Sequence, residues 1–143
     1  MKEGMKVLVA YDGSEESHRA LVAASDLAKQ FKGSVTALNV YWDVAQNRYA
    51  PSLAETEGIS VSDEGSLRIL GNAKDYLESN NVKYELRTER NPNTPKTIMG
   101  LAEKDGYGCI ALGSRGIGGA RAWLLGSVSS RVIAEAHCPV IVV

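Results

Sequence analysis

Three short apolar runs constrain the fold more than any other feature of this sequence. They read Lys-Val-Leu-Val-Ala-Tyr at 6–11, Cys-Ile-Ala-Leu at 109–112 and Pro-Val-Ile-Val-Val at 139–143. A run of this length without polar alternation is typical of a strand that is buried on both faces. Since both faces of a sheet are covered when helices connect parallel strands, these runs indicate an α/β fold.

Helical patterns separate the predicted strands. Ser14 is a natural N-cap, the acidic residues Glu15 and Glu16 suit a helix start, and apolar residues share one face as far as Phe31. A second helix is expected from Ser66. The others are a helix capped by Thr94, with Pro95 at its first position, and a helix over 127–136.

Two further strands fill the gaps in this alternation. Residues 34–42 suit a second buried strand, and residues 82–87 alternate apolar and charged side chains, which predicts an edge strand with one solvated face. With strands at 108–112 and 139–143, the chain has five β/α repeats and suits one domain over residues 1–143. This pattern predicts a doubly wound open sheet, which binds ligands outside the carboxyl ends of its strands where the winding reverses.

The segment 43–65 interrupts this regular alternation. It is polar, contains Pro51 and is longer than the loops of compact domains usually are. We expect either a mobile irregular surface segment or a flap over a ligand at the neighbouring strand ends.

Composition narrows the classes of partner. The net charge is −1 and 23% of residues are charged, without the concentrated basic field that nucleic acid or an anionic membrane requires. No apolar run approaches the roughly 20 residues of a membrane span, and the first residues do not resemble a signal peptide, so we expect a cytoplasmic location.

Cys109 and Cys138 lack metal-ligand spacing and are expected to be buried thiols.

The glycine-rich stretch Gly113-Ser114-Arg115-Gly116, followed after nine residues by Gly126-Ser127, predicts a phosphate cradle. Amides at the end of a strand and at the start of a helix would converge on one anion, the glycines would allow close approach, and Ser127 would cap the helix. It is not a Walker A loop, because Gly119 replaces the lysine. The alternative is a glycine-rich surface loop without a ligand.

Other residues have two readings on the sequence alone. Asp12 either accepts hydrogen bonds from a ribose or base, or only stabilises the turn Asp12-Gly13-Ser14. A backbone group near Val40 would read the edge of an adenine. Arg115 either places a fixed positive charge near the anion or is a solvated loop residue.

The pattern Gly-x2-Gly-x9-Gly-Ser, together with Tyr11-Asp12-Gly13-Ser14 and the closing Cys-Pro-Val-Ile-Val-Val, resembles the ATP-binding branch of the universal stress protein family. The likeness spans nearly the whole chain and implies a Rossmann-like, adenine nucleotide alpha hydrolase-like sheet of order 3-2-1-4-5. It implies that Asp12 binds the nucleotide. The remaining implied contacts are Leu112, Gly113, Arg115 and Gly116 at the ribose and inner phosphates, and Gly126, Ser127 and Val128 at the outer phosphates.

The sequence contains no recognisable group to activate an attacking nucleophile, such as a Walker lysine or a kinase motif. A cradle of this kind binds substrate and transition state almost equally, giving affinity with at most slow hydrolysis. We therefore expect a small ATP-binding regulatory protein. The alternatives are a slow Mg²⁺-dependent ATPase or nucleotidyl or phosphoryl transferase, and a dimerisation module without nucleotide.

The run 139–143 would be an edge strand in the implied order. An open apolar edge favours pairing with another strand, so we expect a homodimer formed through this strand about a two-fold axis, as the resemblance also implies.

Overall fold

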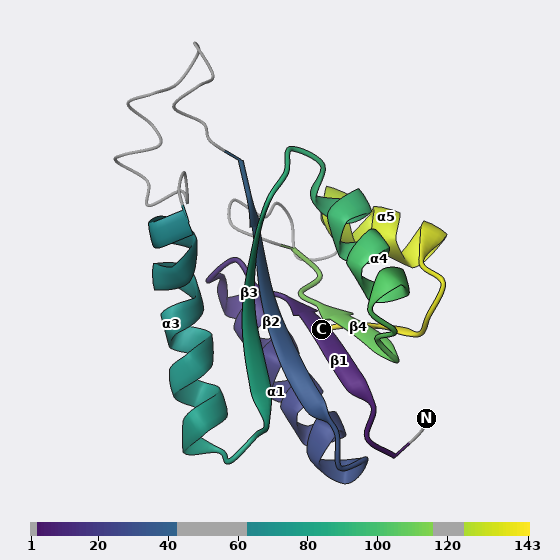
Figure 1. Ribbon diagram of the computed structural model, residues 1–143. Coiled ribbons are helices and arrows are strands. Elements are labelled where there is room, and N and C mark those ends of the chain that lie inside the picture. Colours follow the sequence, from purple (N-terminus) through teal and green to yellow (C-terminus); the bar gives the residue numbers. More distant parts are fainter. Residues whose placement is uncertain (1–2, 43–62, 116–124) are drawn as a thin grey trace.

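The computed structural model describes residues 3–42, 63–115 and 125–143. They form one parallel sheet of five strands in the order β3-β2-β1-β4-β5, with helices on both faces (Figure 1). The strands are β1 (Lys6–Ala10), β2 (Ser34–Tyr41), β3 (Tyr84–Arg90), β4 (Cys109–Leu112) and β5 (Val140–Val142). The predicted fold class and strand order are confirmed.

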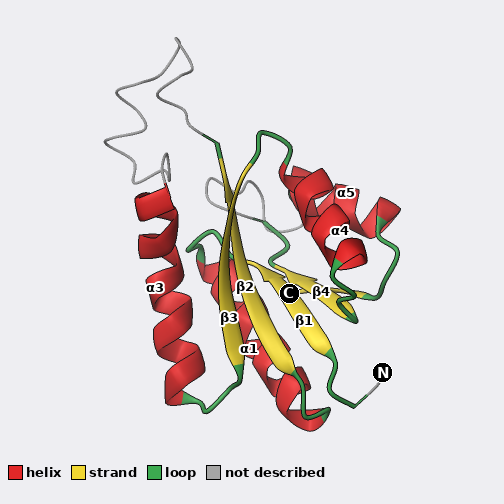
Figure 2. Cartoon of the chain, in the orientation of Figure 1, coloured by secondary structure: helices red, strands yellow, loops and turns green. Residues whose placement is uncertain are grey.

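In the described ranges, helices cover both faces of the sheet (Figure 2). Helices α1 (Glu15–Gln30) and α3 (Asp63–Ser79) lie on one face, and α4 (Thr94–Lys104) and α5 (Ser127–Glu135) lie on the other. None of the helices in the described ranges is long and apolar enough to cross a membrane.

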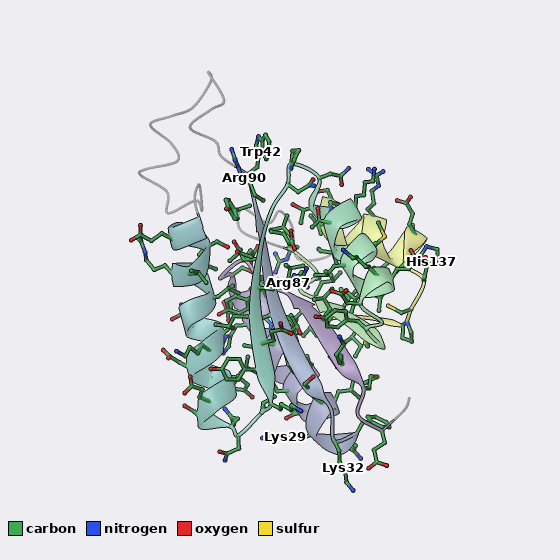
Figure 3. All side chains as sticks on the ribbon, viewed as in Figure 1. Lys29, Lys32, Trp42, Arg87, Arg90 and His137 are labelled. Atoms are coloured by element: carbon green, nitrogen blue, oxygen red, sulfur yellow. The ribbon has the colours of Figure 1, made fainter. Side chains whose placement is uncertain are left out.

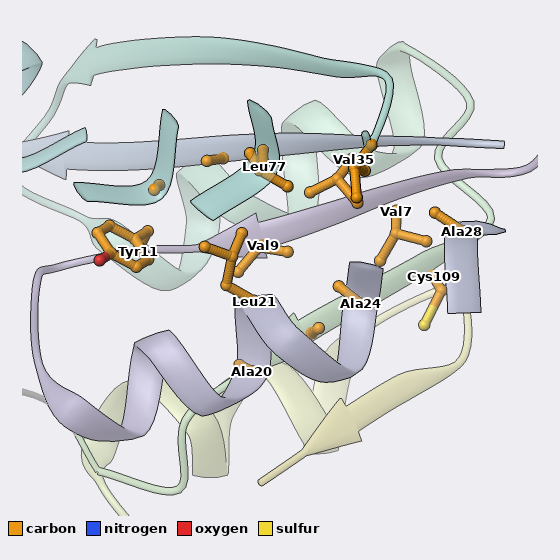
Figure 4. Close-up of a cluster of buried hydrophobic side chains, with 14 of the residues drawn as sticks. Val7, Val9, Tyr11, Ala20, Leu21, Ala24, Ala28, Val35, Leu77 and Cys109 are labelled. Atoms are coloured by element: carbon orange, nitrogen blue, oxygen red, sulfur yellow. The ribbon is translucent and has the colours of Figure 1, made fainter. Parts of the chain in front are cut away.

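The central strands serve two cores, as their continuous apolar sequence predicts. Val7 and Val9 pack with α1 and α3 in one cluster, whose interior is shown in Figure 4, whereas Leu8 packs with α4 and α5 in the other. Successive side chains of a strand point to opposite faces, so a strand between two helical layers must be apolar at every position. The burial of β1 and β4 therefore follows directly from their sequences.

The predicted N-cap is correct for α1 and wrong for α4. Ser14 caps α1 by accepting a hydrogen bond from the amide of Ser17 at 3.1 Å, as predicted. Helix α4 differs, because its N-cap is Asn93, which accepts from the amide of Lys96 at 3.1 Å. Thr94 is instead the first helical residue, so the predicted cap was displaced by one position.

The boundaries of the second repeat also differ from the prediction. Helix α3 begins at Asp63, three residues before the expected Ser66, and the rest of the predicted irregular segment, 43–62, lies outside the described residues. The third strand extends to Arg90 rather than stopping near Arg87, and it forms an edge of the sheet as expected. The second half of β3 was not predicted because residues 87–90 are all polar. A polar sequence is tolerated there because β3 is an edge strand that pairs on only one side.

Candidate functional site

The turn after β1 is built around the carboxylate of Asp12. Its Oδ1 accepts a hydrogen bond from the amide of Ser14 at 2.9 Å, and Gly13 adopts a positive φ of 85°. That conformation is readily adopted by glycine and strained for other residues, so the Asp-Gly-Ser sequence specifies the turn. The turn-stabilising role of Asp12 is therefore present, and it leaves the carboxylate at the carboxyl end of β1, where the binding role is also predicted.

The loop after β4 approaches α1 so closely that it requires glycine. A Cβ atom added at Gly113 would lie 2.6 Å from the Cβ of Glu16 and 2.7 Å from its carbonyl carbon. Gly113 was predicted to leave space for a phosphate, and the structure adds a packing reason that involves the first turn of α1. Sequence reasoning could not identify this reason because Glu16 lies 97 residues earlier in the chain.

Arg115 places a positive charge in this loop, and that charge is paired. Its Nη2 donates to Oε1 of Glu16 at 2.9 Å, and these two side chains are only 22% and 17% exposed. Arg19 Nη2 lies 3.6 Å from the same oxygen. The loop therefore carries a cation whose field is partly offset by a carboxylate, which the sequence alone did not indicate.

The start of α5 contacts the same loop through hydrogen bonds to one carbonyl. The oxygen of Ser114 accepts from the amide of Gly126 at 2.6 Å and from the hydroxyl of Ser129 at 2.9 Å. The amide of Ser114 in turn donates to the carbonyl of Val143 at 2.8 Å, which continues the pairing of β4 with β5. These bonds bring the end of β4 and the start of α5 together, as the spacing of the glycines predicted.

The start of α5 differs from the predicted cradle in its cap. The N-cap of α5 is Gly126, without a side-chain capping bond, so Ser127 does not cap the helix and is its first residue. The amide of Gly126 is directed to Ser114 and is therefore not one of the donors for an anion. The amides of Ser127 and Val128 stand in the first turn of α5, where the helix provides no acceptor for them.

The other predicted residues occupy different parts of this region. Val40 lies near the carboxyl end of β2 and packs partly against the α4/α5 core. Leu112 ends β4 and is 3% exposed, so only its backbone could contact a ligand. Gly116 lies outside the described residues. Trp42 is exposed, with the guanidinium of Arg90 5.3 Å from its ring centroid, beside the ends of β2 and β3 (Figure 3).

Both cysteine side chains are held in environments that disfavour a reactive thiolate. Burial raises the pKa of Cys109 to about 11 and also raises the pKa of the half-buried Cys138. They pack in the cores on opposite faces of the sheet. Since the thiolate is the nucleophilic form, neither environment favours a reactive cysteine. The prediction of buried thiols is confirmed for Cys109, whereas Cys138 is only partly buried.

Sequence reasoning missed two buried residues that are linked to the site by hydrogen bonds, Asn39 and Ser66. Asn39 Nδ2 donates at 2.9 Å to the carbonyl of Tyr11, the residue that precedes Asp12. Ser66 Oγ donates to Oδ1 of Asn39 at 2.7 Å. One signal was available, because Asn39 is the only amide side chain in the otherwise apolar end of β2.

Comparison with known proteins decides the family. The family model described as "Universal stress protein family" matches residues 5–143. This chain belongs to the universal stress protein family. Universal stress protein YxiE of Bacillus subtilis is 34% identical to it, over 96% of this chain and 97% of YxiE.

Solved universal stress proteins have the same fold. One, described as in complex with cAMP, superposes with a TM-score of 0.71 at 22% identity and covers 99% of this chain and 98% of its own. Another, from Archaeoglobus fulgidus in complex with dAMP, has a TM-score of 0.69 at 20% identity and covers 96% of each chain. The whole described sheet is therefore that of the family.

Proposed function

We propose that this universal stress protein binds ATP across the carboxyl ends of β1 and β4, and that it acts as a small nucleotide-dependent regulator in the stress response of the cytoplasm. The observation that carries this proposal is the pair of hydrogen bonds from Gly126 and Ser129 to the carbonyl of Ser114. They hold a strand end beside a helix start, which is the backbone arrangement that favours an anion. Adenine nucleotides in the two solved relatives support the choice of ligand.

The site residues have distinct roles in this proposal. The carboxylate of Asp12 accepts a hydrogen bond from the ribose, the backbone of Val40 reads the adenine edge, and the amides of Ser127 and Val128 meet the outer phosphates. Gly126 has no side chain and so permits the close approach of the loop, the helix and the outer phosphates. The remaining contacts, at the ribose and inner phosphates, are Leu112, Gly113, Arg115 and Gly116. Mg²⁺ enters as the ion carried by the triphosphate, with the Ser127 hydroxyl as its candidate protein ligand.

The geometry of the described residues favours binding over rapid turnover. The carboxylates of Asp12 and Glu16 are already engaged, Asp12 with the amide of Ser14 and Glu16 with Arg115. A general base must reach the proton that it removes, and engagement in structural bonds opposes this. Interactions that stabilise the ground state and transition state equally raise affinity without raising the rate of the chemical step.

Calorimetry and thermal melting of the purified protein test the proposal. We expect ATP with Mg²⁺ to bind with a dissociation constant in the micromolar range, because three or four charge-assisted hydrogen bonds of roughly 1.5–3 kcal/mol remain after ordering costs. At a ligand concentration about 100 times the dissociation constant, binding adds about 2.7 kcal/mol of stability and raises Tm by roughly 6–10 °C. The absence of both heat and a Tm shift with ATP would reject the proposal.

We further propose that the protein forms a homodimer through β5. Val140, Ile141 and Val142 are half-buried at the edge of the sheet. Val143, which follows β5, is 36% exposed, and Ile133 in α5 is 47% exposed. An edge strand with an apolar surround is favourable for pairing with a second copy about a two-fold axis.

The Val142→Pro variant tests this dimer. The carbonyl of Pro139 and the amide of Val143 bond to β4, so by alternation along the strand the amide of Val142 points outward. Proline removes this outward donor while keeping the pairing of β5 with β4. We expect light scattering to report twice the chain mass for the wild type and the single chain mass for the variant, with Tm measured as the folding control. A variant that is still dimeric would contradict pairing through β5.

A further inference from the structure

The carbonyl of Tyr11, one residue before Asp12, is held by a chain of buried hydrogen bonds. The amide nitrogen of Asn39 donates to this carbonyl at 2.9 Å, and the hydroxyl of Ser66 donates to the Asn39 oxygen at 2.7 Å. Asn39 is 4% exposed and Ser66 is fully buried. These hydrogen bonds thus link the end of β1, the end of β2 and the first turn of α3.

Asn39, the central member of this chain of hydrogen bonds, has both a donor and an acceptor role that its neighbours satisfy. The Asn39 amide group donates to the Tyr11 carbonyl and accepts from Ser66, so its orientation is fixed from both ends. A buried polar group that loses its partner is costly, so this arrangement resists rotation of the Tyr11–Asp12 peptide. The side chain of Tyr11 adds a second restraint, because its hydroxyl lies 3.3 Å from Nδ1 of His18 in α1.

The position of this restraint matters for the proposed nucleotide site. Rotation of the peptide between Tyr11 and Asp12 would move the Asp12 carboxylate and break its bond to the amide of Ser14. A site whose supporting bonds are held rigid before binding loses less entropy on binding.

We infer that Asn39 is a positioning residue for the nucleotide site, which holds Asp12 in place through the Tyr11 carbonyl and, through Ser66, couples nucleotide binding to the first turn of α3. This inference rests on the proposed function. Because the coupling between two sites is reciprocal, nucleotide at Asp12 stabilises the start of α3, and an ordered start of α3 raises nucleotide affinity.

Replacement of Asn39 by leucine tests the role, since leucine has a similar volume and makes neither hydrogen bond. We expect calorimetry with ATP and Mg²⁺ to show affinity at least about tenfold weaker than in the wild type, in the range of a lost allosteric coupling. Ser66→Ala removes only the outer bond and is expected to weaken affinity about threefold. It also provides the test if the leucine variant does not fold.

Thr36→Val is the matched control on the same strand. Thr36 is 2% exposed and accepts a hydrogen bond from the Tyr107 hydroxyl at 2.9 Å, near the amino end of β2 and away from the proposed site. It should lower Tm by an amount comparable to Asn39→Leu and leave ATP affinity unchanged. This separates a loss of positioning from a general loss of stability.

Hydrogen exchange provides a readout that a purely structural role would not move. In the wild type, ATP is expected to slow amide exchange in residues 64–69 of α3, and this protection should disappear in Asn39→Leu even at saturating ATP. If the wild type binds ATP while Asn39→Leu binds it within about twofold and keeps the protection, the positioning role is overturned and the proposed function stands. If the wild type itself binds no nucleotide, both fall together.

Discussion

The Gly126→Val variant is expected to bind ATP about 100-fold more weakly than the wild type, a loss of about 2.7 kcal/mol of binding free energy. A Cβ atom at this position would lie 3.3 Å from the carbonyl oxygen of Ser114 and 3.4 Å from the Cα of Arg115. The branched side chain would push the loop after β4 away from the start of α5. In the proposed site, the backbone donors of the loop and of α5 would then no longer converge on one phosphate chain.

The same contacts predict a moderate cost in stability for Gly126→Val. The backbone of Gly126, at φ −69° and ψ 164°, suits any residue, so no conformational strain is expected and overpacking should cost about 1–2 kcal/mol. Calorimetry for affinity and urea denaturation for stability separate the two effects. Gly71→Ala in α3 is the matched control, because nothing lies within 4 Å of its added Cβ and it should leave affinity unchanged. Wild-type affinity in Gly126→Val would contradict the proposed location of the phosphates.

The parts of the fold that depend on local sequence were predictable. The apolar runs at β1 and β4 indicated burial on both faces, and the Ser14 cap placed the start of α1 to the residue. At α4 and α5 the caps were displaced by one residue, because neighbouring polar residues such as Asn93 and Thr94 are both competent caps and only packing selects between them. The strand order came from the family resemblance rather than from periodicity.

The candidate site was predictable in outline and not in its supporting contacts. The spacing of Gly113 and Gly126 indicated that the end of β4 meets the start of α5, and the hydrogen bonds to Ser114 support this meeting. The pairing of Arg115 with Glu16 and the link from Asn39 to Tyr11 join residues that are 99 and 28 positions apart. Such contacts depend on how the layers pack, which residue type and spacing along one chain do not encode.

The Gly113→Ala variant is expected to lose about 3 kcal/mol of the free energy of unfolding even without nucleotide, an amount near the upper end for overpacking. A single methyl group at this position would stand 2.6–3.0 Å from Cβ, the carbonyl carbon and the carbonyl oxygen of Glu16. Two of these atoms are backbone in the first turn of α1, which can move only by displacing the helix from β4. The movement would also break the 2.9 Å ion pair between Glu16 and Arg115.

Measuring this loss without ligand distinguishes two reasons for glycine at position 113. If the glycine only leaves room for a phosphate, alanine should leave the urea midpoint of the ligand-free protein unchanged and reduce ATP affinity alone. If the approach of α1 requires it, the midpoint falls before any nucleotide is added. Gly100→Ala, on the exposed face of α4 with nothing within 4 Å of the new Cβ, should instead raise stability by about 0.5–1 kcal/mol. Opposite shifts in these two variants would show that the close packing of α1 on the loop after β4, rather than glycine content as such, fixes the shape of the site.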